Sequence, residues 1–282
     1  MNPLRIAISG CTGRMGTEII RLAVADPALR IVAAVTRADD PRLGQDAGAA
    51  AGIDPLELPV ATHCVAACDV LIDFSLPAGC RQWAAWCASH EVALVSGTTG
   101  LDEADHAALA ACAEKVPVLW APNMSVGVNL LLRLVADAAA VVGKDWDIEI
   151  VEAHHRHKID APSGTARALL DAIREARGDD SPPAVMHGRS GQCGPRRPGE
   201  IGIHAVRLGD VVGEHEVHLA GEGETLTLRH RAHSRKTFAA GALRAAKWLY
   251  GRPAGLHTMR DVLGGDSQRP GSEAAYRLTP RL

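Results

Sequence analysis

The sequence lacks an excess of charge of either sign. Its 282 residues include 30 basic and 33 acidic side chains, which give a formal net charge of -3. Nucleic acids and membrane surfaces usually attract clusters of basic side chains, so this balance argues against both as partners. The sequence also has no run of about 18 apolar residues, the length that a transmembrane helix needs. We therefore expect neither a nucleic-acid partner nor a membrane-spanning segment.

The sequence also lacks a cysteine pattern typical of disulfide-bonded proteins. There are seven cysteines, an odd number, and no Cys-x-x-Cys motif. Cys64 and Cys68 have a spacing that zinc sites sometimes use, but no second pair of cysteines or histidines lies at a matching distance. The N-terminal sequence enters a strand-like run at once, without the longer apolar stretch and cleavage site of a signal peptide. We therefore expect a reducing compartment and a cytoplasmic protein.

The first half of the sequence alternates between two patterns. Short β-rich runs at residues 4–9, 31–36, 69–75, 92–96 and 116–121 are predicted strands. Alanine-rich stretches with helical spacing separate most of them, at residues 15–25, 78–90 and 102–114. Repeated strand–helix–strand units predict an α/β fold, here a Rossmann-like, doubly wound parallel sheet with helices on both faces.

The pattern changes after Asn123. Helices are predicted at residues 125–142, 164–177 and 235–250, and strands at 147–153, 202–208, 214–219 and 225–230. Consecutive strands without helices between them predict an antiparallel or mixed sheet, and the Pro/Gly/Arg-rich stretch 178–200 is too polar and broken for a core element. We expect a dinucleotide-binding domain at residues 1–124, joined by a returning helix within 235–265, a second α+β domain at 125–234, and a loose tail at 266–282.

A glycine-rich motif, Gly10-Cys11-Thr12-Gly13-Arg14-Met15-Gly16, joins the first predicted strand to the first predicted helix. Glycines at this place let the backbone approach a pyrophosphate, and the helix N-terminus supplies N–H donors. The same glycines could serve only as a tight turn, but their position favours dinucleotide binding. Two further loops, Gly97-Thr98-Thr99-Gly100 and Ala121-Pro122-Asn123-Met124, follow predicted parallel strands, where ligands bind in such sheets. They should border the cofactor, although either could be a plain turn.

The end of the second predicted strand bears on the choice of cofactor. NAD enzymes usually place Asp or Glu there to hold the ribose 2′-hydroxyl, whereas this sequence has Thr36-Arg37. Arginine can pair with a 2′-phosphate, which favours NADPH over NADH. Two alternatives stay open: Arg37 could be a solvated loop residue, and Asp39 or Asp40 could reach a ribose.

The segment Glu152-Ala153-His154-His155-Arg156-His157-Lys158 ends a predicted strand, and Pro162-Ser163-Gly164-Thr165 begins a predicted helix. The helix N-terminus offers the N–H groups of Gly164 and Thr165 to an anion. Lysine adds a charge and histidine a proton donor, so the segment predicts a pocket for a carboxylated substrate beside a general acid. A solvated basic loop is one alternative. A transition-metal site is another, but Arg156 and Lys158 would repel a cation, and we expect no metal. Five other histidines should be surface or satisfied core residues: His204, His215, His218, His230 and His233.

The histidine-rich block resembles the signature of the dihydrodipicolinate reductase family, the 4-hydroxy-tetrahydrodipicolinate reductases. The resemblance covers nearly the whole chain up to about residue 263, through residues 10–16, 73–75, 97–100, 123–129, 209–215 and 259–263. It implies that NADPH or NADH reduces a cyclic, dicarboxylated imine, 4-hydroxy-tetrahydrodipicolinate, to tetrahydrodipicolinate with loss of water. This reaction belongs to the biosynthesis of lysine and diaminopimelate. It also implies a homotetramer, assembled through the second, substrate-binding domain, and closure of the two domains over the ligands.

By motif position, the resemblance implies that His154 is a proton donor or acceptor and Lys158 a second proton donor. It implies that His155, Gly164 and Thr165 contact the substrate, and that residues 10–15, 97–99 and 121–124 line the cofactor. Some family members carry an acidic residue where this chain has Thr36, and this departure predicts weaker use of NADH. The resemblance assigns no role to the tail.

Other functions share part of this pattern. Another Rossmann-fold reductase, acting on a quinone or on a small amino or keto acid, would have the glycine loop, but a small-acid dehydrogenase would not explain the histidine and lysine block. A nicotinamide-sensing protein without catalytic activity should have lost His154 or Lys158, and both are present.

Overall fold

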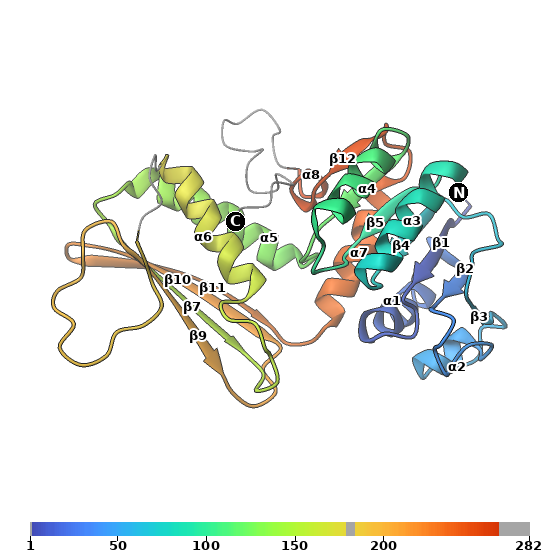
Figure 1. The fold of residues 1–282 in the computed structure, drawn as a ribbon, viewed down its shortest axis with the longest axis horizontal. Helices are drawn as coiled ribbons and strands as arrows, with labels where there is room; N and C mark the ends of the chain where they lie inside the picture. Colours follow the sequence, from blue (N-terminus) through green and yellow to red (C-terminus); the bar gives the residue numbers. More distant parts are fainter. Residues whose placement is uncertain (1, 179–183, 265–282) are drawn as a thin grey trace. The chain divides into compact units, whose positions relative to one another are not determined.

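The computed structural model describes residues 2–178 and 184–264, which form two compact units (Figure 1). Unit 1 contains the described residues up to Val126 and those from Arg235 onward, and unit 2 contains Gly127 to Ser234. The expected tail at 266–282 lies outside the described residues.

Unit 1 is built on a seven-stranded parallel sheet in the order β12-β6-β5-β4-β1-β2-β3. The strands are β1 (Leu4–Ser9), β2 (Leu29–Val35), β3 (Val60–Ala61), β4 (Val70–Asp73), β5 (Ala93–Ser96), β6 (Pro117–Trp120) and β12 (Gly255–His257). Strands β4 and β5 are buried along their whole length, and β1 is buried from Ile6 to Ser9, because both faces of the sheet are covered. The strand order reverses between β1 and β4, and ligands bind such sheets at this point, outside the carboxyl ends of the strands.

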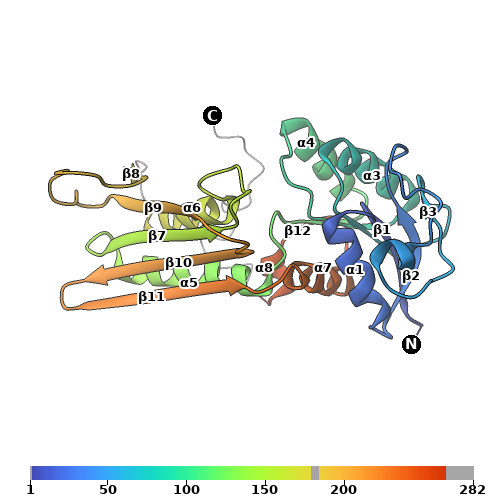
Figure 2. The same cartoon turned by 90° about the horizontal axis from the view of Figure 1, so that it is seen from below.

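Helices cover both faces of this sheet (Figure 2). They are α1 (Arg14–Val24), α2 (Ala47–Ala51), α3 (Pro77–His90), α4 (Glu103–Ala113), α7 (Lys236–Leu249) and α8 (Met259–Val262). One apolar cluster joins α1 and α7 to one face, and a second joins α3 and α4 to the other. Helix α7 follows unit 2 in the sequence but packs beside α1, where Lys247 forms an ion pair with Asp26. The predicted returning helix is therefore part of unit 1.

Unit 2 is a five-stranded mixed sheet in the order β11-β10-β7-β9-β8. Its strands are β7 (Asp147–His154), β8 (Val185–Met186), β9 (Ile201–Arg207), β10 (Gly213–Gly221) and β11 (Glu224–Ala232). Strands β7, β9 and β8 are parallel, whereas β10 is antiparallel to both of its neighbours. Helices α5 (Val126–Val142) and α6 (Gly164–Arg177) cover one face of the sheet (Figure 1).

The helix-covered face of the sheet in unit 2 carries both an apolar core and a cluster of polar side chains. Apolar side chains alternate along the strands and pack under α5 and α6: Ile148, Ile150, Ile201, Ile203, Val217 and Leu219. Because alternate residues of a strand point to the same side, Glu152 and His154 of β7, Arg207 of β9 and His215 of β10 lie further along this same face. The helix-covered face thus changes from apolar to polar at one end.

The predicted fold class is confirmed, and each predicted strand and helix occurs with ends within two residues of the expected ones. Five short elements were not predicted: α2, β3, β8, β12 and α8. Strand β8 lies at the edge of the sheet within the stretch 178–200, which was expected to hold no core element. Its two residues are half-buried and pair with the start of β9, a contact that local sequence does not reveal.

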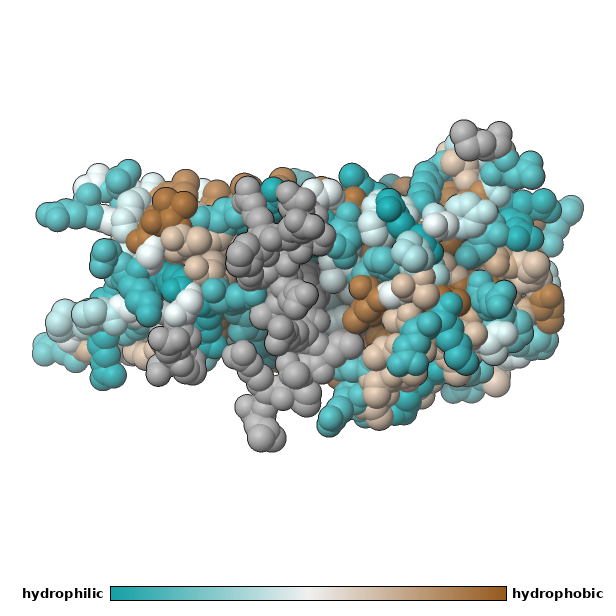
Figure 3. Space-filling model, turned by 90° about the horizontal axis from the view of Figure 1, so that it is seen from above, coloured by the Kyte–Doolittle hydropathy of each residue, from teal (hydrophilic) through white to brown (hydrophobic). Residues whose placement is uncertain are grey.

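No helix of the described residues is long and apolar enough to cross a membrane. Figure 3 shows one face of the molecule, on which hydrophilic residues surround smaller hydrophobic patches.

Candidate functional site

The glycine loop lies between β1 and α1, as predicted. Gly10 has a φ of 70°, and a Cβ there would lie 2.5 Å from the carbonyl oxygen of Phe74. A Cβ at Gly16 would lie 2.2 Å from the carbonyl oxygen of Gly10, so glycine lets α1 begin close against the turn. Gly13 is the N-cap of α1 and has no side chain to accept from the first-turn N–H groups, which favours an anion there. The other predicted residues of this loop are the buried Cys11 and Thr12, and Arg14 and Met15, which begin α1.

Asp40 ties the end of β2 to the glycine loop. Its Oδ2 accepts from the hydroxyls of Thr12 (2.6 Å) and Thr36 (3.1 Å), and its Oδ1 accepts from the backbone N–H of Arg42 (2.9 Å). The hydrogen bond from Thr12 is the main cause that holds the pKa of Asp40 well below its usual range. Asp40 is therefore a buried, ionised anchor whose oxygens are engaged within the protein.

Arg37 lies between Thr36 and Asp40 in the sequence, at the surface of the protein. Its side chain is 64% exposed, and its Nε lies 3.0 Å from Oδ1 of Asp39, which is also exposed. Exposed ion pairs contribute little stability, so the guanidinium remains able to exchange this partner for a phosphate.

Asp73, at the end of β4, anchors the next predicted loop. It is fully buried and accepts from the hydroxyls of Thr98 (2.8 Å) and Ser96 (3.1 Å). A Cβ at Gly97 would lie 2.2 Å from the ring of Phe74, so this loop passes close to the segment after β4. The sequence suggested no role for Asp73, although a carboxylate that ends an apolar strand could have indicated one.

The last predicted cofactor loop follows β6. The buried Ala121 donates its N–H to the carbonyl of Ser96 (3.1 Å), and Met124 is buried as well. Asn123 accepts from the N–H of Ser125 (3.0 Å), and Pro122 is exposed. All four predicted loops, after β1, β2, β5 and β6, therefore lie at the carboxyl edge of the sheet in unit 1.

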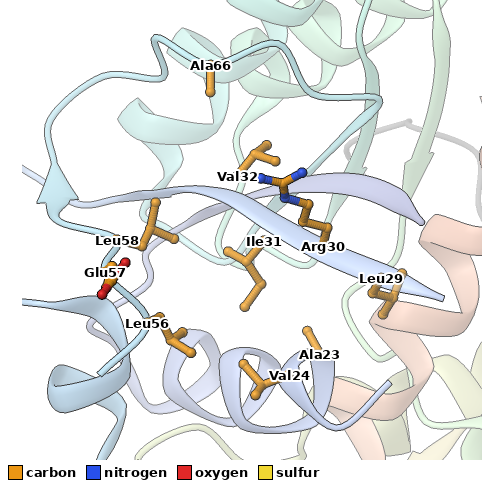
Figure 4. A pocket seen from close by; sticks show the side chains of 10 residues that line it. All are labelled: Ala23, Val24, Leu29, Arg30, Ile31, Val32, Leu56, Glu57, Leu58 and Ala66. Atoms are coloured by element: carbon orange, nitrogen blue, oxygen red, sulfur yellow. The ribbon is translucent and has the colours of Figure 1, made fainter. Parts of the chain in front are cut away.

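A pocket of about 500 Å³ lies elsewhere in unit 1 (Figure 4). It is bordered by the start of β2, the end of α1, residues 56–58 and Ala66. Figure 4 shows Ile31, Leu56 and Val24 gathered between β2 and α1, with Arg30 on the other side of the strand. The pocket lies at the beginning of β2, whereas the predicted loops follow the ends of their strands, so we do not assign it to the cofactor.

In unit 2, the histidine-rich segment begins on β7, where His154 is hydrogen-bonded to the buried carboxylate of Glu152. Nδ1 of His154 lies 2.6 Å from Oε2 of Glu152, whose side chain is fully buried. Arg207 of β9, the strand neighbour of His154, donates to both oxygens of Glu152 at 2.8 Å. Burial acts to raise the pKa of Glu152, but the hydrogen bonds from His154 and Arg207 outweigh it and bring this pKa to about 2. Glu152 is therefore a carboxylate at neutral pH.

The loop after β7 carries the other predicted residues. Nζ of Lys158 lies 2.8 Å from Oδ1 of Asp160, and the rings of His155 and His157 lie 6.3 Å apart. Ser163 caps α6, and its Oγ accepts from the N–H of Ala166 at 3.2 Å. Gly164 and Thr165 are the first two residues of α6, and a Cβ on Gly164 would meet nothing within 4 Å. The start of this helix thus has donors and open space for an anion.

His215 of β10 is a buried neighbour of His154. The two rings are T-shaped with centroids 5.2 Å apart, and Nε2 of His215 lies 3.2 Å from Oγ of Ser163. Burial, with a contribution from the charge of His154, lowers the pKa of His215 to about 3. His215 is therefore neutral near pH 7 and is no proton donor there. From the sequence, His215 was expected to be a surface or satisfied core residue. His215 is buried, but its position beside His154 was not predicted.

The structure brings the predicted site residues into two groups, one in each unit. Sequence reasoning missed Arg207 and His215 because they approach β7 only through the register of β9 and β10. Of the other histidines, His204 pairs with Glu149 (2.7 Å) and His218 with Thr227 (3.0 Å), both remote from His154 along their strands.

Comparison with known proteins gives matches over both units. A family model described as the N-terminus of dihydrodipicolinate reductase matches residues 4–124, and one described as its C-terminus matches residues 127–263. The 4-hydroxy-tetrahydrodipicolinate reductase of Thiobacillus denitrificans is 49% identical over 263 residues, which cover 93% of this chain and 98% of that protein. That of Methylococcus capsulatus is 47% identical over 264 residues, covering 93% and 98%.

Solved structures of other proteins are also similar to this chain. A dipicolinate-bound dihydrodipicolinate reductase from Paenisporosarcina sp. TG-14 superposes with a TM-score of 0.71 at 27% identity, covering 91% of this chain and 97% of that one. An amine dehydrogenase from Mycobacterium smegmatis, at 14% identity and a TM-score of 0.62, shares the fold.

Proposed function

The chain belongs to the dihydrodipicolinate reductase family, and we propose that it reduces 4-hydroxy-tetrahydrodipicolinate to tetrahydrodipicolinate with loss of water. The electron donor is a reduced nicotinamide nucleotide, and the product serves the biosynthesis of diaminopimelate and lysine. The observation that carries the proposal is the pairing of His154 with a buried carboxylate next to the open N-terminus of α6. This arrangement offers a proton donor beside an anion site, as a dicarboxylated imine requires.

The residues of unit 1 fit a dinucleotide. The turn at Gly10 and Gly16 leaves no room for a Cβ, and the first turn of α1 has N–H groups to hold a pyrophosphate. When bound, the nicotinamide supplies the hydride. Asp40 and Asp73 hold the surrounding loops in place through buried hydrogen bonds.

The residues of unit 2 bind the substrate and deliver protons. The N–H groups of Gly164 and Thr165 hold one carboxylate, and His155 contacts the ring. Addition of a hydride to a carbon conjugated with an imine leaves enamine-like electron density, which must be protonated. His154 supplies this proton, and Lys158 supplies a second one to the 4-hydroxyl, which leaves as water while the neighbouring carbon gives up a proton to solvent. A positioned donor of this kind contributes about 10²–10⁴-fold to the rate.

We further propose that NADPH is preferred over NADH. Thr36 carries no charge to repel a 2′-phosphate, and the exposed Arg37 can pair with one. The buried acidic residue nearest to Thr36 in the sequence is Asp40. Its oxygens already accept hydrogen bonds from Thr12, Thr36 and Arg42.

An absorbance assay tests the function and the preference together. The purified protein receives freshly generated 4-hydroxy-tetrahydrodipicolinate with either nucleotide. Rapid oxidation of NADPH and slower oxidation of NADH are the expected result. Equal rates with the two nucleotides would support the reductase activity but contradict the preference for NADPH. No oxidation of either nucleotide would overturn the proposed function.

The protein is also proposed to act as a homotetramer in the cytoplasm, assembled through unit 2. All seven cysteines lie among the described residues as free thiols, in keeping with a reducing compartment.

Unit 2 exposes several large apolar side chains that an interface would cover, among them Leu130, Leu134, Val141, Val206, Leu208 and Leu226.

A further inference from the structure

Glu152 is a buried carboxylate whose acceptor positions are all occupied. Its Oε2 accepts from Nδ1 of His154 (2.6 Å) and from Arg207 (2.8 Å). Its Oε1 accepts from the backbone N–H of Ser163 (3.0 Å) and from the second terminal nitrogen of Arg207 (2.8 Å). A carboxylate offers about four lone-pair positions, so these four bonds use its capacity in full.

This arrangement determines which nitrogen of His154 carries the proton. An ionised carboxylate can only accept hydrogen bonds, so Nδ1 must be the donor. In the neutral ring the proton therefore lies on Nδ1, and Nε2 is the nitrogen that exchanges a proton with a ligand. A Cβ at Gly213 would lie 3.1 Å from Nε2, so this glycine keeps the space beside it open.

The same carboxylate also holds the start of α6. Ser163 is the N-cap of this helix, and its N–H is bonded to Glu152. Arg207 balances the charge of Glu152 through a bidentate pair and donates to the carbonyl of Asp160 (2.7 Å), in the loop that joins β7 to α6. The proton donor and the helix terminus are thus fixed to one side chain.

We propose that Glu152 is a positioning residue, which fixes the Nδ1–H tautomer of His154 and aligns its Nε2 with the anion site at the start of α6. The proposal rests on the role of His154 in the proposed function. Glu152 itself touches no reacting atom. It acts as the carboxylate partners of catalytic and metal-binding histidines do, by setting the tautomer and orientation of the ring.

The tautomer can be read directly by nuclear magnetic resonance. The full-length protein is labelled with ¹⁵N-histidine, and long-range ¹H–¹⁵N spectra are recorded without ligand at a pH where the ring is neutral. His154→Gln identifies the signals of His154. We expect a protonated Nδ1 and a bare Nε2 in the unmodified protein, and a shift towards the Nε2–H tautomer in Glu152→Gln, because an amide can donate to Nδ1 as well as accept.

Kinetics provide the second readout, with Glu149→Gln as the matched control. Glu149 lies on the same strand and also pairs with a histidine, His204, at 2.7 Å. Glu152→Gln should lower kcat at least about tenfold with an unchanged KM for NADPH. Glu149→Gln should keep kcat within about twofold and leave the signals of His154 in place.

Either of two results would overturn the proposal: an Nε2–H tautomer of His154 in the unmodified protein, or unchanged tautomer and kcat in Glu152→Gln. If Glu152→Gln does not fold, the tautomer of the unmodified protein decides alone. Failure of the proposed function is a separate outcome, because a protein that reduces no substrate can still show the Nδ1–H tautomer.

Discussion

At the scale of single residues, His215 links the acid stability of the protein to the site. Burial disfavours its charged form and lowers the pKa of His215 to about 3, against 6.5 as the ordinary value. Between these two pH values the unfolded chain takes up a proton that the folded protein does not. The free energy of unfolding therefore falls as the pH falls through this window.

His215→Gln removes this contribution. Denaturant unfolding at pH 7 and pH 5 should show that the unmodified protein loses about 2 kcal/mol more than the variant over this interval. Glu152 has a pKa of about 2 in the folded protein and an ordinary pKa of 4.5, so it lowers the free energy of unfolding only when the pH falls below about 4.5. An equal loss in both proteins would show that His215 is protonated, or exposed, in the folded state.

At the scale of elements, the side chain of Ser163 caps the start of α6. Oγ of Ser163 accepts from the N–H of Ala166 at 3.2 Å, and loss of such a cap costs about 1 kcal/mol. Ser163→Ala should therefore lower the free energy of unfolding by about that amount. The control is Ser89→Ala, because Ser89 lies at the exposed end of α3 and caps no N–H group. Similar losses in the two variants would contradict the capping role.

The elements themselves were largely predictable from the sequence. Strands such as β1 and helices such as α6 are long enough for their apolar periodicity to be read, and α6 also begins at a capping serine. Strands β3, β8 and β12 have two or three residues each, too few for a period, and exist because a neighbouring strand pairs with them.

The candidate site was predictable only in its local parts. The segment from Glu152 to Lys158 is contiguous, so its chemistry could be read directly. Arg207 and His215 lie far along the chain and reach Glu152 through strand register, which no local pattern encodes. Likewise, the tie between Asp40 and Thr12 needs β1 and β2 to be neighbours.

At the scale of the whole molecule, the oligomeric state can be tested. The apolar side chains exposed on α5 and on the strands of unit 2 favour self-association. Light scattering should give a mass about four times the 29.7 kDa of one chain. Leu134→Glu, on the exposed side of α5, should lower this mass if α5 contributes, whereas Val24→Glu on unit 1 should not. A monomer at all concentrations would contradict the tetramer.

The central claim is that the histidine of β7 delivers a proton during reduction of a dicarboxylated imine. The most direct measurement compares NADPH oxidation by the unmodified protein, His154→Gln and the control His204→Gln, with 4-hydroxy-tetrahydrodipicolinate as substrate. His204 also pairs with a glutamate of β7, so both variants remove a histidine that is bonded to a carboxylate. The two histidines differ in their position along the sheet. We predict active unmodified protein, a loss of at least about 100-fold in kcat for His154→Gln, and a change of less than about threefold for His204→Gln. Equal activity of all three proteins, or no oxidation by the unmodified protein, would contradict the claim.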